Sequence, residues 1–287
     1  MYRLRQPATL ASLKEKIQFS FVGIDREIKG ITSIDVCEPD SLSFCIGPLP
    51  KDACGVVVAN SCESRSDLTV IECTNPRLLF SKIVNTILYQ RNFEFLHQET
   101  NVDPSSSIAS SVIIGVNCKV GKNTTICENV VIHDSSVIGD NVIIRENSII
   151  GAEGFGFERD PEQRNLPIAF PHLAGVVIED FVEVGSNTVV AKGALNDTYI
   201  RRGTKINSLV RIAHHCDIGE NTLVMAGVIL GGGVRIGSNA LLGTNSTVRQ
   251  KISLGNNVVV GSGAVVVNNF KDNSTAIGNP ARELRKI

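Results

Sequence analysis

Residues 112–150 read VIIGVNCKVGKNTTICENVVIHDSSVIGDNVIIRENSII. Within this stretch an isoleucine or valine recurs every six residues, from Ile114 through Ile132 to Ile150, without a miss. The residue two positions before each of these is small or β-branched, as at Ser148. A six-residue step with one aliphatic corner predicts a parallel β-helix, whose coils stack at a spacing of about 4.8 Å.

The six-residue period is interrupted twice. It stops at Gly151, resumes at Ile178, slips by four residues after Val190, and then runs from Ile200 to Val266. Three faces of six residues make one coil, so residues eighteen apart should lie directly above one another. The first interruption, Gly151 to Gly175, is long enough to leave the prism as a loop, and the second covers Ala191 to Tyr199. Interruptions of this kind are where a solenoid can build a site.

The sequence predicts three parts. Residues 1–103 lack the period and read as a small α/β domain, which could bind a ligand or only cap the first coil. Its strands are expected at 55–59 and 68–72, with helices from the Thr9 cap to Ile17 and from Asn75-Pro76 to about Gln90. The fold class is therefore mainly β: a left-handed parallel β-helix over 104–270, with a capping tail at 271–287. The left hand is taken from known hexapeptide-repeat proteins, since a period carries no hand.

Charge and hydropathy exclude several classes of function. Lys plus Arg is 28 and Asp plus Glu is 29, for a formal net charge of -1, so no field of one sign points to nucleic acid or to an anionic membrane. The N-terminus has no apolar run of signal-peptide length, and no stretch reaches the roughly 20 apolar residues that span a bilayer. We expect a soluble cytoplasmic protein with no membrane span and no nucleic-acid partner.

The cysteines favour a structural role. The chain has 8 cysteines and no CxxC pair, which argues against a zinc knuckle and against a disulfide framework in a chain without an export signal. We expect small buried apolar residues. They are Cys37, Cys45, Cys54, Cys62, Cys73, Cys118, Cys127 and Cys216.

The residues best suited to chemistry are His214 and His215. Ile212 occupies an inner corner and Cys216 an inward face, so the two histidines fall on a turn and point outward. Gly232 follows His214 by eighteen residues, which places it one coil away. A general base beside a backbone N–H that no side chain covers is the pair that acyl transfer requires.

Two alternatives stay open at this turn. Asn196 and Asp197 lie on the opposite side of His214, where either could orient the imidazole. A metal site built on His214 and His215 is disfavoured, because adjacent histidines rarely bind one ion and no third ligand follows at ligand spacing. We therefore predict no metal.

Several motifs resemble the UDP-3-O-acylglucosamine N-acyltransferase family of the lipid A pathway. They are the segments 150–157, 185–188 and 193–198, the tripeptide Ile212-Ala213-His214, and in the N-terminal part Leu42-Ser43-Phe44 and Asn75-Pro76. The resemblance implies that His214 is the general base and that Gly232 supplies the oxyanion N–H. It also implies a homotrimer with active sites between neighbouring prisms, and an N-terminal domain that stacks the nucleobase, with Phe44 as the retained aromatic.

The chain also departs from that family. Gly47 and Pro50 stand where the family carries uridine-binding Asn and Tyr residues, Ala191 replaces an Asp, and Lys251 replaces a second His near the acyl arm. We expect no C-terminal docking helices for acyl carrier protein. The ending Gly278-Asn279-Pro280-Ala281 instead resembles the closing turn of hexapeptide acetyltransferases that use coenzyme A.

The sequence therefore favours an enzyme that moves a short acyl group, of acetyl or hydroxybutyryl type, from acyl-coenzyme A to the amine of a UDP- or dTDP-linked amino-deoxy sugar. The alternatives are the lipid A N-acyltransferase, which uses hydroxyacyl-acyl carrier protein, and a noncatalytic β-solenoid binding protein. The expected substrate-binding residues are Phe44, Gly154, Phe155, Gly156, Phe157 and His215, although the loop aromatics could equally pack the loop down. The expected coenzyme A contacts are Gly231, Lys251, Gly278, Asn279 and Arg282.

Overall fold

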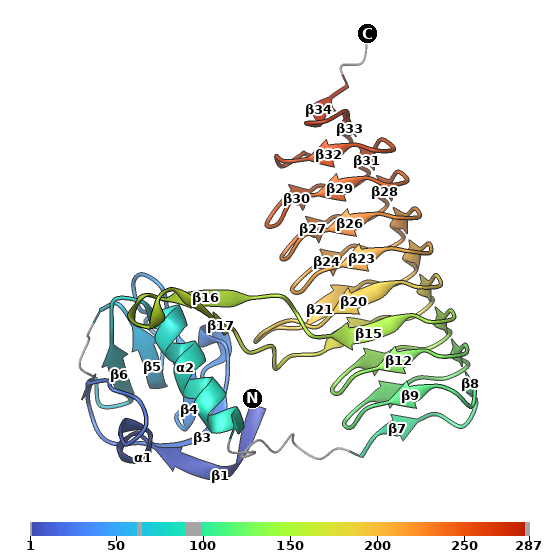
Figure 1. Ribbon diagram of the computed structural model, residues 1–287. Helices are drawn as coiled ribbons and strands as arrows, with labels where there is room; N and C mark the ends of the chain where they lie inside the picture. Colours follow the sequence, from blue (N-terminus) through green and yellow to red (C-terminus); the bar gives the residue numbers. More distant parts are fainter. Residues whose placement is uncertain (1, 62–64, 90–98, 285–287) are drawn as a thin grey trace. The chain divides into compact units, whose positions relative to one another are not determined.

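The computed structural model describes residues 2–61, 65–89 and 99–284, so Cys62 and the expected helix end at Gln90 lie outside the described residues. Internal contacts divide the chain into two compact units (Figure 1). The N-terminal unit comprises Met1–His97 together with Gly156–Pro171, and the solenoid unit comprises Gln98–Phe155 together with His172–Ile287. Residues Gly156–Pro171, which lie within the first interruption, thus belong to the N-terminal unit.

The N-terminal unit is built on a six-stranded sheet in the order β1-β3-β4-β5-β6-β2. Strands β3 to β6 run parallel, and the edge strands β1 and β2 pair antiparallel with β3 and β6. Strands β5 and β6 occupy the two segments expected from sequence. The strand bounds are β1 Tyr2–Thr9, β2 Phe21–Val22, β3 Glu27–Ile31, β4 Ser41–Phe44, β5 Gly55–Ala59 and β6 Leu68–Glu72.

The helices of this unit begin at the predicted caps. Thr9 Oγ1 accepts a hydrogen bond from the Ser12 N–H at 3.2 Å, and α1 covers Leu10–Lys14, which is shorter than expected. Asn75 Oδ1 accepts from the Leu78 N–H at 3.1 Å, and α2 covers Pro76–Tyr89. A 3₁₀ turn, η1, covers Ile34–Val36. Capping side chains satisfy donors that the first helical turn leaves without partners.

A hairpin from the first interruption packs on α2. It consists of β16 (Phe157–Asp160), the 3₁₀ turn η2 (Pro161–Gln163) and β17 (Leu166–Ala169), with β16 and β17 antiparallel. Lys82 on α2 places its Nζ 2.8 Å from a carboxylate oxygen of Asp160, whose side chain is fully buried. The hydrogen bond from Lys82 holds the pKa of Asp160 below its ordinary value. This buried ion pair attaches the hairpin to the helix.

The solenoid unit is a parallel β-helix with three sheets. The first sheet contains β7 Asn101–Val102, β10 Lys119–Val120, β13 Val137–Ile138, β18 Val176–Ile178, β21 Thr198–Ile200, β24 Asp217–Ile218, β27 Arg235–Ile236 and β30 Ser253–Leu254. The second contains β8 Ser107–Ile108, β11 Thr125–Ile126, β14 Ile143–Ile144, β19 Glu183–Val184, β22 Lys205–Ile206, β25 Leu223–Val224, β28 Leu241–Leu242, β31 Val259–Val260, β33 Thr275–Ile277 and β34 Arg282–Glu283. The third contains β9 Ile113–Ile114, β12 Val131–Ile132, β15 Ile149–Ala152, β20 Val189–Ala191, β23 Arg211–Ile212, β26 Ile229–Leu230, β29 Thr247–Val248 and β32 Val265–Val266.

Strand pairing confirms the predicted register. Ile212 pairs with Leu230 one coil on, and Leu230 pairs in turn with Val248, so residues eighteen apart are stacked. The second interruption adds four residues to one coil, because Val189 pairs with Arg211. The solenoid therefore passes both interruptions and keeps its three faces.

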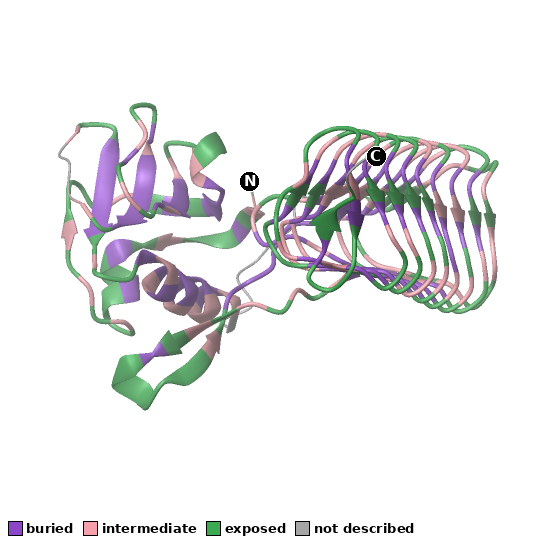
Figure 2. Cartoon of the chain, turned by 90° about the horizontal axis from the view of Figure 1, so that it is seen from above, coloured by how far each residue is buried: buried purple, intermediate pink, exposed green. Residues whose placement is uncertain are grey.

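The interior is lined by the aliphatic corners and by hydroxyls that have partners. Figure 2 shows buried positions recurring from coil to coil. Thr124 and Thr222 are fully buried, and their hydroxyls donate to the carbonyls of Gly139 at 2.9 Å and Gly237 at 3.1 Å. A buried polar group that is hydrogen-bonded in this way avoids most of the cost of desolvation.

Most corners of the solenoid have one residue in the left-handed backbone region. Asn221 and Asn239 have φ of 54° and 58°, and the same turn position carries glycine at Gly233, with φ of 70°. Asparagine and glycine tolerate this region best. His215 stands at that position with φ of 59°, and histidine is among the non-glycine residues that adopt this region more often than most.

No helix within residues 2–61, 65–89 and 99–284 is long and apolar enough to cross a membrane.

We predict that Lys82→Met lowers the thermal unfolding midpoint at pH 7, because it leaves the Asp160 carboxylate buried without its cation. A folded-state pKa below the ordinary 3.8 contributes stability above that pH and loses it as the pH falls further. The difference between wild type and variant should therefore shrink below pH 3.8. Lys119→Met, at an exposed position, is the control. An equal difference in unfolding midpoint at pH 7 and below pH 3.8 would contradict the role of the ion pair.

Candidate active site

His214 and His215 lie in the turn between β23 and β24, as the period predicts. Ile212 and Cys216 on either side are fully buried, whereas both histidines are half-buried. Burial raises the pKa of Cys216 to about 12, so its thiol stays protonated at neutral pH and is unsuited to be a nucleophile. The two imidazoles are therefore the candidates for acid–base chemistry at this turn.

Gly232 lies against the ring of His214. A Cβ atom added to Gly232 would stand 2.7 Å from His214 Nε2 and 2.6 Å from Cε1. The neighbouring coils are joined here by the Gly233 N–H, which donates to the His214 carbonyl at 2.8 Å. The absence of a side chain at position 232 is therefore what leaves room for the imidazole.

The N–H of Gly232 is available to a ligand. On either side of it the N–H groups of Gly231 and Gly233 donate to backbone carbonyls at 2.9 and 2.8 Å. Across the described ranges, 2–61, 65–89 and 99–284, no protein acceptor is hydrogen-bonded to the Gly232 N–H. A backbone donor left free beside an imidazole can bind a developing oxyanion.

His215 makes hydrogen-bonding contacts through its backbone and through both ring nitrogens. Its backbone N–H donates to Thr198 Oγ1 at 2.9 Å, and its Nε2 accepts from the Ala194 N–H at 2.9 Å. Its Nδ1 lies 2.8 Å from Nδ1 of His214. The second interruption thus supports the histidine pair mainly through Ala194 and Thr198.

Asn196 and Asp197 occupy this same segment. Asp197 Oδ1 accepts a hydrogen bond from the Gly175 N–H at 2.7 Å, which joins the returning end of the first interruption to the second. Asn196 is exposed, and its backbone carbonyl lies against Gly193, where a Cβ would overlap it. His214 Nδ1 lies 2.8 Å from His215 Nδ1, and a role of Asn196 or Asp197 in orienting His214 stays a prediction.

His172 is a further candidate for this site, which sequence reasoning missed. It is 4% exposed, and its ring centroid lies 5.2 Å from that of His214. Its Nδ1 is 3.7 Å from a carboxylate oxygen of Glu153, which also pairs with Lys192 Nζ at 2.9 Å. The ring packs against Gly154, where a Cβ would overlap it. The only available signal was its place next to Pro171, just before the period resumes.

The remaining predicted substrate residues fall partly in the N-terminal unit. Phe155, in the solenoid unit, is 80% exposed, and Phe157, on β16 of the N-terminal unit, is 46% exposed. Gly156 accepts a hydrogen bond from the Phe170 N–H at 2.9 Å. Phe44 packs with its ring centroid 4.9 Å from that of Phe80 and 5.7 Å from that of Phe170. Phe44 is thus part of an aromatic cluster in the N-terminal unit.

The predicted coenzyme A contacts are spread along the solenoid. Gly231 adjoins Gly232, and the Lys251 N–H donates to the Gly232 carbonyl at 2.9 Å, so Lys251 lies one coil beyond the glycine. Gly278 accepts from the Val265 N–H at 3.0 Å, three coils beyond β23. Asn279 and Arg282 are exposed beside it, at the closing turn between β33 and β34.

Metal ligands do not gather at the histidines. Of the residues that the structure describes, one group has three ligand atoms within 4.8 Å of one another, namely Cys127, Glu128 and Glu146. It lies on the turns of early coils.

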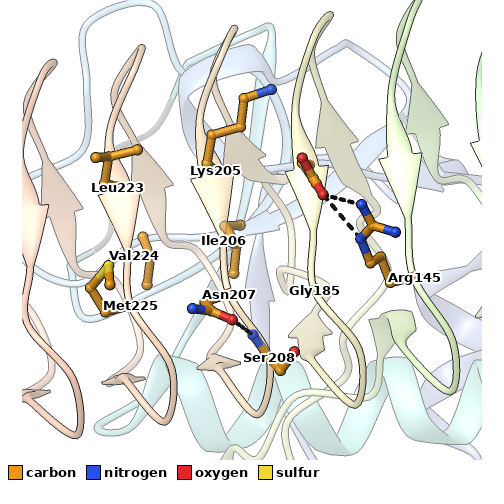
Figure 3. Close-up of a pocket in the computed structure, with 10 residues that line it drawn as sticks. Arg145, Gly185, Lys205, Ile206, Asn207, Ser208, Leu223, Val224 and Met225 are labelled. Carbon is orange, nitrogen blue, oxygen red and sulfur yellow. Dashed lines mark hydrogen bonds and ion pairs between the residues drawn. The ribbon is translucent and has the colours of Figure 1, made fainter.

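A pocket of about 250 Å³ lies on the second sheet, at a different corner from His214 (Figure 3). Arg145 Nη2 is paired there with Glu183 at 2.6 Å, and Lys205, Leu223 and Met225 complete much of its wall. A cation beside apolar side chains suits an amphiphilic ligand or a neighbouring protein surface.

Comparison with known proteins shows the family of this chain. Residues 117–152 and 233–268 match the family model described as bacterial transferase hexapeptide (six repeats). The UDP-3-O-acylglucosamine N-acyltransferase of Syntrophotalea carbinolica is 37% identical over 256 residues, covering 78% of this chain and 74% of that protein. The chain belongs to the UDP-3-O-acylglucosamine N-acyltransferase family.

Other members and a solved structure are also similar. The enzyme of the same name from Campylobacter lari is 32% identical over 243 residues, covering 76% of this chain and 75% of that protein. The crystal structure of UDP-N-acetylglucosamine O-acyltransferase from Moraxella catarrhalis aligns with 66% of this chain and 73% of that chain, at 25% identity and a TM-score of 0.44.

Membership of the N-acyltransferase family bears on the readings made from sequence. The chain is an acyltransferase, so the noncatalytic solenoid is not supported. The named relatives support the alternative, a UDP-3-O-acylglucosamine N-acyltransferase, better than the short-acyl, coenzyme A-dependent reading that the sequence favoured.

We predict that Gly232→Ala lowers acyltransferase activity by about a hundredfold, because the new methyl group forces the His214 ring from its place. The circular dichroism spectrum, which reports the secondary structure of both units, should be unchanged. Gly263→Asn is the matched control, since Gly263 has φ of 68°, nothing lies within 4 Å of its added Cβ, and asparagine suits that conformation. Full activity in Gly232→Ala would contradict the packing of His214 on Gly232.

Proposed function

We propose that this chain transfers an acyl group from an acyl carrier protein thioester to the free amine of a UDP-linked 3-O-acylglucosamine, the substrate named for its relatives, in lipid A biosynthesis. The observation that carries the proposal is the free N–H of Gly232 beside the imidazole of His214. Family membership supports the substrate class.

The reaction needs no covalent enzyme intermediate. The amine nitrogen attacks the thioester carbonyl carbon while His214 removes one amine proton. The Gly232 N–H hydrogen-bonds the oxyanion that forms. The carbon–sulfur bond then breaks, the amide is completed, and the proton on His214 passes to the leaving thiolate.

The N-terminal unit is proposed to bind the nucleotide. Phe44 offers an aromatic ring in a cluster with Phe80 and Phe170, and Arg77 lies with its guanidinium carbon 4.3 Å from the Phe170 ring centroid. Binding energy from a remote nucleotide can hold the sugar amine at the reacting centre, where proximity lowers the barrier.

We also propose a homotrimer that buries the second sheet. Leu223, Leu241 and Val259 stack on one another along this sheet, and they are 44%, 36% and 38% exposed. A continuous apolar ladder of this kind is typical of a protein–protein interface. Closed rotational symmetry is the usual way to cover such a surface.

His214→Ala should lower kcat by about two to four orders of magnitude, the usual contribution of a general base. The measurement is amide formation with UDP-3-O-acylglucosamine and a hydroxyacyl-acyl carrier protein. His133→Ala, an exposed histidine on an early coil, should retain wild-type activity. Near-normal turnover by His214→Ala would exclude the base assignment.

The acyl donor is tested with the wild-type protein and two substrates. We expect turnover with hydroxyacyl-acyl carrier protein and little with the matching acyl-coenzyme A. The opposite preference, together with acylation of an amino-deoxy sugar linked to UDP or dTDP, would restore the short-acyl reading and overturn the proposed donor.

For the assembly, Leu241→Lys should shift the trimer towards monomer in sedimentation equilibrium, because a charge would be buried at the interface. Ser253→Lys makes the corresponding change on the polar first sheet and should leave the trimer intact. A wild-type monomer, or a trimer unaffected by Leu241→Lys, would argue against this interface.

A further inference from the structure

Both ring nitrogens of His215 are in hydrogen-bonding contact. Nε2 is 2.9 Å from the backbone nitrogen of Ala194, and Nδ1 is 2.8 Å from Nδ1 of His214. These two contacts together decide where the protons lie, because a neutral imidazole has one donor and one acceptor nitrogen.

The backbone contact sets the proton of His215. The Ala194 N–H can only donate, so His215 Nε2 must offer its lone pair. Neutral His215 then carries its proton on Nδ1. That N–H faces His214 Nδ1, which must in turn be the acceptor. Neutral His214 is left with its proton on the other nitrogen, Nε2.

We propose that His215 is a positioning residue that fixes the tautomer of His214, with the His214 proton held on Nε2, the nitrogen beside Gly232. In the free protein His214 Nε2 and Gly232 N are then both donors at one place, which suits binding of a carbonyl oxygen.

The consequence for catalysis rests on the proposed function. A base that takes the amine proton at Nε2 needs a lone pair there, and the contact with His215 withholds it. Before His214 can accept a proton at Nε2, its own proton must move to Nδ1, and His215 Nδ1 must then accept a hydrogen bond instead of donating one. The proton of His215 would then lie on Nε2, which breaks the hydrogen bond from the Ala194 N–H. The Ala194 carbonyl accepts hydrogen bonds from Leu173 N at 2.8 Å and Ala174 N at 3.1 Å. A movement of Ala194 would therefore couple proton uptake at His214 to the second interruption.

The backbone makes one replacement of His215 especially informative. His215 has φ of 59°, and asparagine occupies the equivalent turn position at Asn221 and Asn239 with φ of 54° and 58°. His215→Asn should therefore preserve the turn. Its amide can either donate to His214 Nδ1 or accept from it, so the variant removes the constraint on the tautomer and keeps a polar partner.

The test is NMR of the full chain with ¹⁵N-labelled histidine, without substrate, at a pH of about 8.5, well above the ordinary histidine pKa of about 6.5. Two-bond ¹H–¹⁵N correlations identify the protonated nitrogen of each ring, and His214→Gln and His215→Asn assign the signals. We expect Nδ1–H for His215 and Nε2–H for His214 in the wild type. In His215→Asn we expect His214 to populate both tautomers, with His133 unchanged.

Two results would overturn the proposal. One is an Nε2–H tautomer for His215 in the wild type, and the other is an unaltered Nε2–H pattern for His214 in His215→Asn. Neither result depends on turnover, so failure of the tautomer assignment can be told apart from failure of the proposed acyltransferase reaction.

Discussion

Backbone hydrogen bonds between residues one coil apart are the interaction on which this protein depends. Each strand of the solenoid is only two to four residues long, so no strand is stable alone, and each coil is held by the coils above and below it. The same bonds place Gly232 beside His214, as in the bond from Gly233 N to the His214 carbonyl. The site is therefore assembled by stacking, by residues distant in sequence that share one corner of the prism.

Lack of side chains is as important to this site as the side chains themselves. Gly232 makes room for His214, Gly154 for His172, and Gly193 brings the second interruption against the ring of His215. Three imidazoles can gather at one corner because a glycine backs each of them. Close packing of this kind limits which groups a ligand can displace.

Where the period holds, the sequence predicted the structure closely. The corners, the pairing of residues eighteen apart and the adjacency of His214 and Gly232 all follow from it, because hydrogen bonding along a parallel stack fixes the register. Where the period stops, the sequence predicted that the chain leaves the prism but not which structure it forms there. The β16–β17 hairpin and the position of His172 depend on tertiary contacts such as that between Lys82 and Asp160, which no local pattern encodes. The choice of acyl donor rested on the closing turn Gly278-Asn279-Pro280-Ala281 and on the expected lack of docking helices, and a single sequence does not show how much weight such departures carry.

The stacked register also constrains how a gene for such a protein can change. Inserting or deleting one residue within a coil would move every later aliphatic corner off the interior, because side chains alternate between the two faces of a strand. The four extra residues before Thr198 are tolerated because they bulge out at a corner and return the chain to the same face, with Val189 paired to Arg211. Insertions and deletions should therefore accumulate at corners, or arise as duplications of whole coils. The six-residue period along the sequence would then record where such changes occurred.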